Sequence, residues 1–125
     1  MASRIALITC LNCVIPTFYL WAYEVSPEMV DDFYELYGPE GAWVALFRRA
    51  PGYLDTELIV DRNQPSRFVT IDRWESKEAF DSFRTEFGTD FDQLDRLGEE
   101  LIERETMLGE FGLTGGTEKT GQNKS

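Results

Sequence analysis

The chain has 125 residues, a formal net charge of −11 and a sequence pI near 4.3. This length predicts one domain. Phosphate backbones and anionic lipids attract clustered Lys and Arg, so we expect a chain this acidic to bind neither nucleic acid nor a membrane surface. Aromatic residues make up 14% of the sequence, and because each buries a large area they can fill a small core or wall a cavity.

Residues 1–17 form an apolar N-terminal extension. Its apolar run, residues 5–15, is too short to span a bilayer, and no small-x-small cleavage site follows it. We therefore predict a cytoplasmic protein rather than an exported one. The extension carries both cysteines, Cys10 and Cys13. A single CxxC pair in a chain without histidine cannot complete a four-ligand site, so no metal site is predicted.

Residues 19–25 alternate in side-chain character and favour a first strand. Ser26 and Pro27 then supply the N-cap and the first position of a helix. The apolar stripe of that helix consists of Met29, Val30, Phe33, Leu36 and Tyr37. Gly38 and Pro39 interrupt it, and a second helical piece continues to Arg49.

Residues 53–60 and 67–74 read as two strands of a hairpin joined by a polar loop. Ser76 caps the next helix, which Gly88 interrupts before a second piece continues to Leu101. Residues 105–111 are the last strand, and residues 112–125 are predicted to be a disordered tail. The order βαββαβ over residues 18–111 predicts a ferredoxin-like α+β domain with a four-stranded antiparallel sheet and its helices on one face.

The two hairpin strands carry apolar side chains on both of their faces. Leu58, Val60, Val69 and Ile71 are assigned to one face, and Ile59 and Phe68 to the other. A sheet that is apolar on both faces, but is covered by its own helices on only one, needs a partner. We therefore predict a homodimer in which the uncovered sheet faces meet.

Four segments resemble the antibiotic biosynthesis monooxygenase-like family of dimeric α+β barrels. They are the strand entering Val25-Ser-Pro27, then Phe47-Arg-Arg-Ala-Pro-Gly-Tyr-Leu54, Thr70-Ile-Asp-Arg-Trp-Glu-Ser-Lys-Glu-Ala-Phe80, and Glu103-Arg-Glu-Thr-Met-Leu-Gly-Glu-Phe111. The resemblance covers residues 19–111. It implies a dimeric α+β barrel, a pocket between sheet and helices, and, in the oxygenase branches, chemistry without metal or flavin.

Two features of that family are missing. Without histidine, the proximal haem ligand of the haem-cleaving branch cannot be present, so we expect no cofactor. The pocket asparagine of the oxygenase branches has no clear counterpart, because Asn12, Asn63 and Asn123 fall in the extension, the hairpin loop and the tail. Trp74 stands where the family often has a pocket tryptophan.

A hairpin register that pairs Leu58 with Val69 defines the candidate site. One face of the hairpin then presents Asp55, Glu57, Ile59, Phe68, Thr70, Asp72 and Trp74. Glu57 and Asp72 are the candidate catalytic bases, because oxygenation without a cofactor requires a deprotonated substrate. The alternative is that these acids form ion pairs with Arg67 or Arg73.

Six further residues are predicted to bind the substrate: Trp74, Trp43, Tyr37, Phe47, Tyr23 and Thr70. Each aromatic residue among them has an alternative role in the core. We therefore predict a monooxygenase that uses no cofactor and acts on a small aromatic or polyketide-like molecule. The alternative is a dimeric module of the same fold that binds a small apolar ligand, or has a structural role, without turnover.

Overall fold

The computed structural model describes residues 15–114. Most of the predicted N-terminal extension, with Cys10 and Cys13, and most of the predicted tail lie outside these residues. At the two edges, the first strand already begins at Thr17 and the last strand ends at Gly112.

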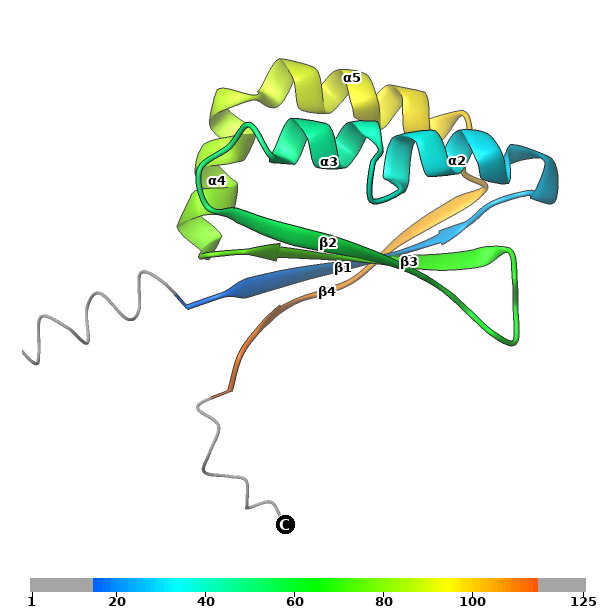
Figure 1. Ribbon diagram of the computed structural model, residues 1–125, viewed down its shortest axis with the longest axis horizontal. Coiled ribbons are helices and arrows are strands. Elements are labelled where there is room, and N and C mark those ends of the chain that lie inside the picture. The colour runs from blue at the N-terminus through cyan, green and yellow to red at the C-terminus, as the bar shows by residue number, and fades with distance from the viewer. Residues whose placement is uncertain (1–14, 115–125) are drawn as a thin grey trace, which may run out of the picture.

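Strands and helices follow the predicted βαββαβ order, with both helical connections broken in the middle (Figure 1). The elements are β1 (Thr17–Glu24), the 3₁₀ turn η1 (Pro27–Met29), α2 (Val30–Tyr37), α3 (Ala42–Phe47), β2 (Tyr53–Val60), β3 (Arg67–Trp74), α4 (Lys77–Glu86), α5 (Gly88–Glu99) and β4 (Arg104–Gly112). The hairpin strands have the predicted bounds, and the predicted interruptions separate α2 from α3 and α4 from α5.

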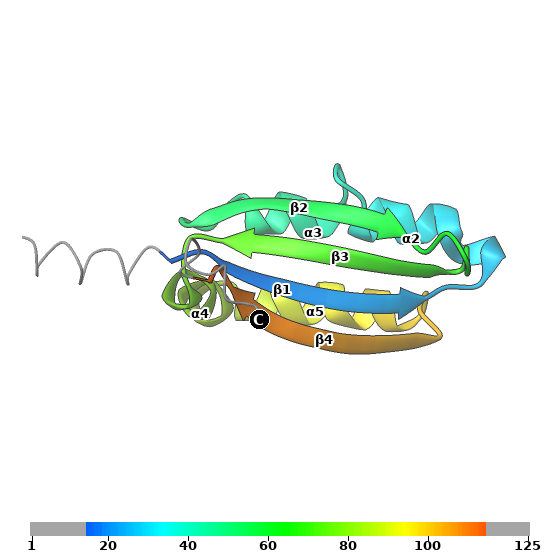
Figure 2. The ribbon, with the colours of Figure 1, turned by 90° about the horizontal axis from the view of Figure 1, so that it is seen from below.

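The four strands form one antiparallel sheet in the order β2-β3-β1-β4. All helices lie on one side of it, and the opposite face carries none in the described chain (Figures 1 and 2). The predicted ferredoxin-like α+β fold is therefore confirmed. The two central strands, β1 and β3, face the helical layer, and a site can form between them and the helices.

Local signals explain where the helices start and stop. Ser76 caps α4, because its hydroxyl accepts a hydrogen bond of 3.1 Å from the backbone N–H of Ala79. Gly41 comes so close to the end of α2 that an added Cβ would lie 2.8 Å from the carbonyl oxygen of Leu36. Only glycine allows the chain to turn this tightly from α2 into α3.

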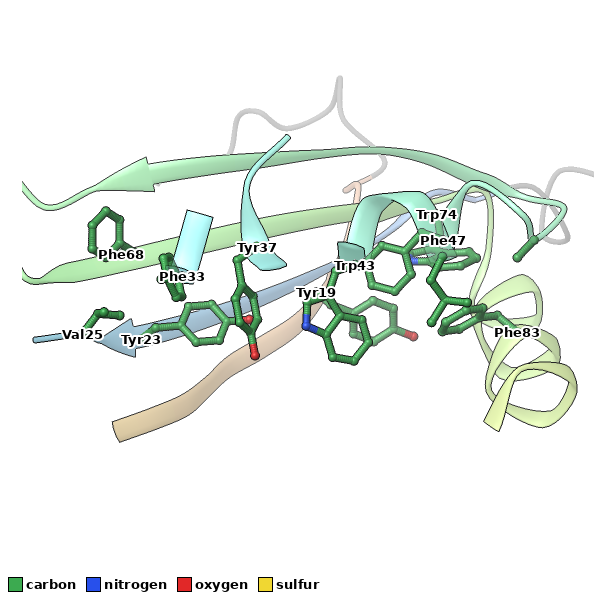
Figure 3. Close-up of a cluster of buried hydrophobic side chains, with 12 residues drawn as sticks. Tyr19, Tyr23, Val25, Phe33, Tyr37, Trp43, Phe47, Phe68, Trp74 and Phe83 are labelled. Atoms are coloured by element: carbon green, nitrogen blue, oxygen red, sulfur yellow. The ribbon is translucent and has the colours of Figure 1, made fainter. Parts of the chain in front are cut away.

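The core lies between the helices and the sheet and is mostly aromatic (Figure 3). Its most deeply buried large side chains are Trp74, Phe33, Phe83 and Val25. Rings pack against one another along the whole length of this layer, which is how a short chain assembles a sufficient apolar volume.

The hairpin register differs from the prediction by one residue. Tyr53 still pairs with Trp74, but a bulge follows, and from there Asp55 lies opposite Arg73 and Thr56 opposite Asp72. A β-bulge inserts one extra residue, which exchanges the faces of every residue beyond it. The predicted pair of Leu58 with Val69 is therefore wrong, and Asp55, Glu57 and Ile59 do not share a face with Asp72.

The bulge also changes the apolar pattern of the uncovered face. Ile59 lies opposite Val69 there, and Ile71 lies opposite Glu57, whereas Leu58 and Val60 turn to the helical side with Phe68. The two-sided apolar character of the hairpin is retained, but its members are not those assigned from the sequence. Ile59 keeps 49% of its surface exposed.

Candidate functional site

A cavity of about 500 Å³ lies between the sheet and the helices. Every strand and each of the helices α2 to α5 contributes to its wall. Its lining residues are Tyr19, Trp21, Tyr23, Tyr37, Trp43, Val44, Phe47, Thr56, Thr70, Asp72, Lys77, Phe80, Asp81, Arg84, Phe91, Asp95, Glu105, Met107 and Glu110. Cavities of this size and apolar lining are typical of small-molecule sites.

The floor of the cavity is set by the two-residue period of β1. Tyr19, Trp21 and Tyr23 alternate along that strand and all turn to the helical side. The Tyr23 hydroxyl is 3.1 Å from Thr70 Oγ1 on the neighbouring strand, in a buried hydrogen bond. This bond fixes the ring of Tyr23 in the middle of the floor.

The helical wall is formed by Tyr37 at the end of α2, by Trp43 and Phe47 on α3, and by Phe91 on α5. Trp43 makes an edge contact with Phe91 at a centroid distance of 4.9 Å. The hydroxyl of Tyr37 reaches α5 at Gly98, where an added Cβ would lie 2.1 Å from its oxygen. Burial raises the pKa of Tyr37, so this phenol stays protonated and available as a donor.

Asp72 is held by a chain of hydroxyl groups. Thr56 Oγ1 donates to Asp72 Oδ1 at 2.8 Å, and the Tyr53 hydroxyl donates to Thr56 Oγ1 at 2.8 Å. The carboxylate is surrounded by protein, yet part of its surface is open to the cavity. Burial raises the pKa of Asp72 to about 6, and the hydrogen bond from Thr56 partly opposes that rise.

Glu57 does not belong to this site. Its carboxylate lies on the opposite face, where Oε1 accepts a hydrogen bond of 3.0 Å from Arg73 Nη2, and Arg73 also binds Asp55 at 2.6 Å. The prediction that Glu57 lines the pocket is therefore wrong. The bulge after Tyr53 is the reason, because it turns Thr56 rather than Glu57 toward the cavity.

Trp74 does not line the cavity either. Its side chain has no exposed surface and packs against Phe47, Tyr53, Phe80 and Phe83 at centroid distances of 5.2 to 5.5 Å. The structure thus gives Trp74 the core role that the sequence left as its alternative. Five of the predicted binding residues do line the cavity: Trp43, Tyr37, Phe47, Tyr23 and Thr70.

The sequence reasoning missed several lining residues. Tyr19 and Trp21 follow from the same alternation that indicated Tyr23. Thr56 required knowledge of the bulge, which has no clear sequence signal. Glu105 lies beside Tyr23 because β4 pairs with β1, and the sequence does not specify that register. Arg84 and Asp95 depend on how α4 and α5 rotate about their axes.

Within residues 15–114, no three His, Cys, Asp or Glu side chains are grouped to hold a metal ion. In that same part of the chain, no helix is long and apolar enough to cross a membrane.

The sequence model of the antibiotic biosynthesis monooxygenase family matches residues 20–86, more than half of the chain. The protein therefore belongs to that family. The matched segment runs from Leu20 within β1 to the end of α4 and includes Tyr23, Asp72 and the helical wall from α2 and α3, while α5 and β4 lie beyond it.

Solved structures with the same fold are distant in sequence. SnoaB, a cofactor-independent oxygenase from Streptomyces nogalater, aligns with a TM-score of 0.62 and 19% identity over 80% of this chain and 94% of its own. A conserved protein from Methanosarcina mazei aligns with a TM-score of 0.61 and 15% identity, over 78% and 92%. A conserved protein of unknown function from Bacteroides thetaiotaomicron gives 0.61 and 13%, over 81% and 100%. No curated protein matches the chain. These similarities establish the fold and leave the substrate open.

Proposed function

We propose that the protein is a monooxygenase that works without a cofactor on an aromatic or polyketide-like substrate bound in the cavity, with Asp72 as the general base. The observation that carries this proposal is the position of Asp72. It is the carboxylate that faces the cavity from the central strand β3, it has a pKa near 6, and hydroxyl groups fix its orientation.

The surroundings of Asp72 suit this task. A general base works best when its pKa lies near the working pH, and burial has moved this carboxyl upward toward that range. Because Thr56 occupies Oδ1, the other oxygen, Oδ2, is left for the substrate. Aromatic walls such as Tyr23 and Trp43 offer flat surfaces on which a ring system can lie.

The proposed reaction begins when Asp72 removes a proton from an activated CH₂ group, or from a phenol whose electrons reach that carbon. The carbanion gives its electrons to dioxygen, and a C–O bond forms. The resulting peroxide anion takes the proton back from Asp72. Loss of water then breaks the O–O bond and leaves a ketone, so one oxygen atom enters the product and the other enters water.

The Tyr37 hydroxyl on the cavity wall supports this chemistry, because burial keeps it protonated and the indole N–H of Trp43 is directed at its oxygen. A donor on the cavity wall can stabilise the oxygen of the substrate when negative charge develops on it.

The alternative function, binding without turnover, is supported by the absence of Asn and His from the cavity lining among the described residues.

The decisive experiment measures oxygen uptake and quinone formation with anthrone, together with a blank that records spontaneous oxidation. We expect catalysed uptake that Asp72→Asn abolishes and that Glu57→Gln retains. The two substitutions remove one carboxylate each, on opposite faces of the sheet. Turnover that survives in Asp72→Asn would exclude this carboxyl as the base.

We also propose that two copies associate through the uncovered face of the sheet. Ile59, Val69 and Ile71 lie on that face, and a sheet apolar on both sides gains by covering the second one. Light scattering after size exclusion should give about twice the chain mass of 14.4 kDa. Val69→Lys should produce a monomer, whereas a wild-type protein that is monomeric at micromolar concentration would refute the proposal.

A further inference from the structure

The charged side chains around the cavity are mostly acidic. Five carboxylates line it, together with two cationic groups: Asp72, Asp81, Asp95, Glu105 and Glu110, and Lys77 and Arg84. A ligand that enters therefore meets an excess of negative charge. Asp72 and Asp95 are half-buried and the other charged residues are exposed, so most of this charge lies where the cavity opens to solvent.

Of the two cationic groups, Lys77 is paired with an acid, whereas Arg84 keeps its charge over an aromatic ring. Lys77 Nζ forms an ion pair with Asp81 Oδ2 at 2.8 Å. The guanidinium carbon of Arg84 lies 3.9 Å from the ring centroid of Phe91, an arrangement typical of a cation–π contact. No described residue forms an ion pair with Asp95 or Glu105. These two carboxylates remain uncompensated.

Asp95 and Glu105 act on the same part of the cavity from α5 and β4. Burial raises the pKa of Glu105, and the charges of Asp95 and Glu99 raise it further. The same three acids add to the rise in the pKa of the Tyr37 phenol that burial causes. Glu105 and the Tyr37 phenol thus lie in a negative potential at this side of the cavity.

The aromatic rings beside these acids are suited to binding an ammonium group. Phe91 precedes Asp95 by one helical turn, so both face the cavity from α5. Trp43 is 8% exposed, and its indole N–H turns to the side of the Tyr23 and Tyr37 hydroxyl groups (Figure 3). Arg84 already covers one face of Phe91, so Trp43 and the tyrosine rings are the ones left to surround an ammonium group next to the carboxylates.

We propose that the cavity selects aromatic ligands that carry a protonated amine and rejects aromatic carboxylates. The carboxylates of Asp95 and Glu105 attract the amine and repel a ligand carboxylate. This inference rests on the proposed function only in taking the cavity as the ligand site. It adds the class of ligand, and it concerns residues of α5 and β4 that have no part in the proposed proton transfer.

The test compares three probes of nearly equal shape: naphthylmethylamine, naphthylmethanol and naphthoate, all substituted at the same ring carbon. Their affinities are measured by calorimetry at low and at high salt. We expect the amine to bind best and the carboxylate worst, with about a tenfold or larger separation between them that salt reduces. The indole resonances of ¹⁵N-Trp-labelled protein report where the probes bind, because Trp43 lines the cavity and Trp74 does not.

The double variant Asp95→Asn with Glu105→Gln should bring the three affinities together. Its matched control is Asp92→Asn with Glu100→Gln, which changes the net charge equally at two exposed residues that do not line the cavity. The control should retain the order of affinities. If the control erases the order as well, general protein charge is responsible and Asp95 and Glu105 are not the selecting residues.

Equal affinities, or a preference for naphthoate, would overturn the charge selection while the cavity remained a ligand site. Failure of all three probes to bind, with no shift of the Trp43 resonance, would overturn the inference as well. Oxygen uptake with anthrone, an uncharged substrate, is measured separately. The oxygenase proposal can therefore stand or fall independently of this result.

Discussion

Two regions of the aromatic layer look alike in composition and differ in structure. At one end, Trp74 is enclosed by rings from α3, α4 and β2 and leaves no space. Toward the middle, Trp43 lines a cavity whose floor is Tyr23. Both indole N–H groups are buried, and that of Trp43 is directed at the Tyr37 hydroxyl. Aromatic density therefore does not by itself mark a pocket. The two regions differ in their polar neighbours, because Thr70 and Asp72 lie beside the cavity that Trp43 lines.

The largest effect that can test this difference is expected from Trp74→Ala. Removing a fully buried indole leaves a void, which should lower the free energy of unfolding by about 3 to 5 kcal/mol. Trp43→Ala should cost less, because part of its ring already faces the cavity. Urea denaturation of both variants measures the contrast. Equal losses would mean that the two rings are packed alike.

Asp72→Asn is expected to reduce turnover by about a hundredfold or more if the carboxyl is the general base. The substitution retains the shape of the side chain and removes its ability to take a proton. Glu57→Gln serves as the control on the other face of the sheet, and its turnover should stay close to that of the wild type. Steady-state kinetics with anthrone compares them. A similar loss in both variants would contradict the placement of the site.

Gly98→Ala tests the wall of the cavity where Tyr37 meets α5. The added methyl group would lie 2.1 Å from the tyrosine hydroxyl oxygen, so the ring must move. We expect a loss of about 1 to 3 kcal/mol. Tyr37→Phe in the same chain should restore part of that loss. Gly88→Ala is the control, because nothing lies within 4 Å of the added Cβ. Thermal unfolding that fails to separate the two glycines would refute the contact.

The pH dependence of stability provides a smaller test at Asp72. Its pKa is raised from 3.8 to about 6 in the folded protein, so the folded state binds more protons than the unfolded state between these values. Stability from this group therefore falls as the pH rises through that interval and levels off above it. We expect a change on the order of 1 kcal/mol, because the side of the carboxylate open to the cavity is partly solvated.

The Asp72→Asn variant isolates this contribution when unfolding is measured from pH 4 to pH 7. The difference from the wild type should grow across the interval. Thr56→Val removes the hydrogen bond that lowers the pKa of Asp72, so the midpoint should move to a higher pH. A midpoint that stays in place would show that Thr56 does not orient this carboxylate.

The smallest effect is expected on the uncovered face. Arg73 bridges Asp55 and Glu57 there, and both acids are more than half exposed. Exposed ion pairs contribute little, so Glu57→Gln should change the free energy of unfolding by no more than about 1 kcal/mol. The change should also shrink in high salt. Urea denaturation at two salt concentrations measures it, and a larger loss would show that this acid has a structural role that the ion pair does not explain.

The order of the elements, the bounds of the hairpin strands and the family fold were predictable from the sequence alone, whereas β1, α3, α5 and β4 differ from their predicted bounds by one or more residues and Ser26 does not cap a helix. Local signals were sufficient for this, because Ser76 caps α4, Gly38 ends α2, and the alternation along β1 turns Tyr23 toward the helices. Each of these signals acts between residues that are close in the sequence, so it can be recognised without knowledge of the fold.

Which acid faces the cavity depends on the tertiary structure. The bulge after Tyr53 has no clear signal in the local sequence, but it exchanges the two faces of β2. Thr56 therefore reaches Asp72, and Glu57 turns to Arg73. Whether Trp74 or Trp43 borders empty space likewise depends on how α3, α4 and α5 pack over the sheet. Pairing register and helix packing are relations between segments far apart in the chain, and hydrophobic patterning restricts them without fixing them to one residue.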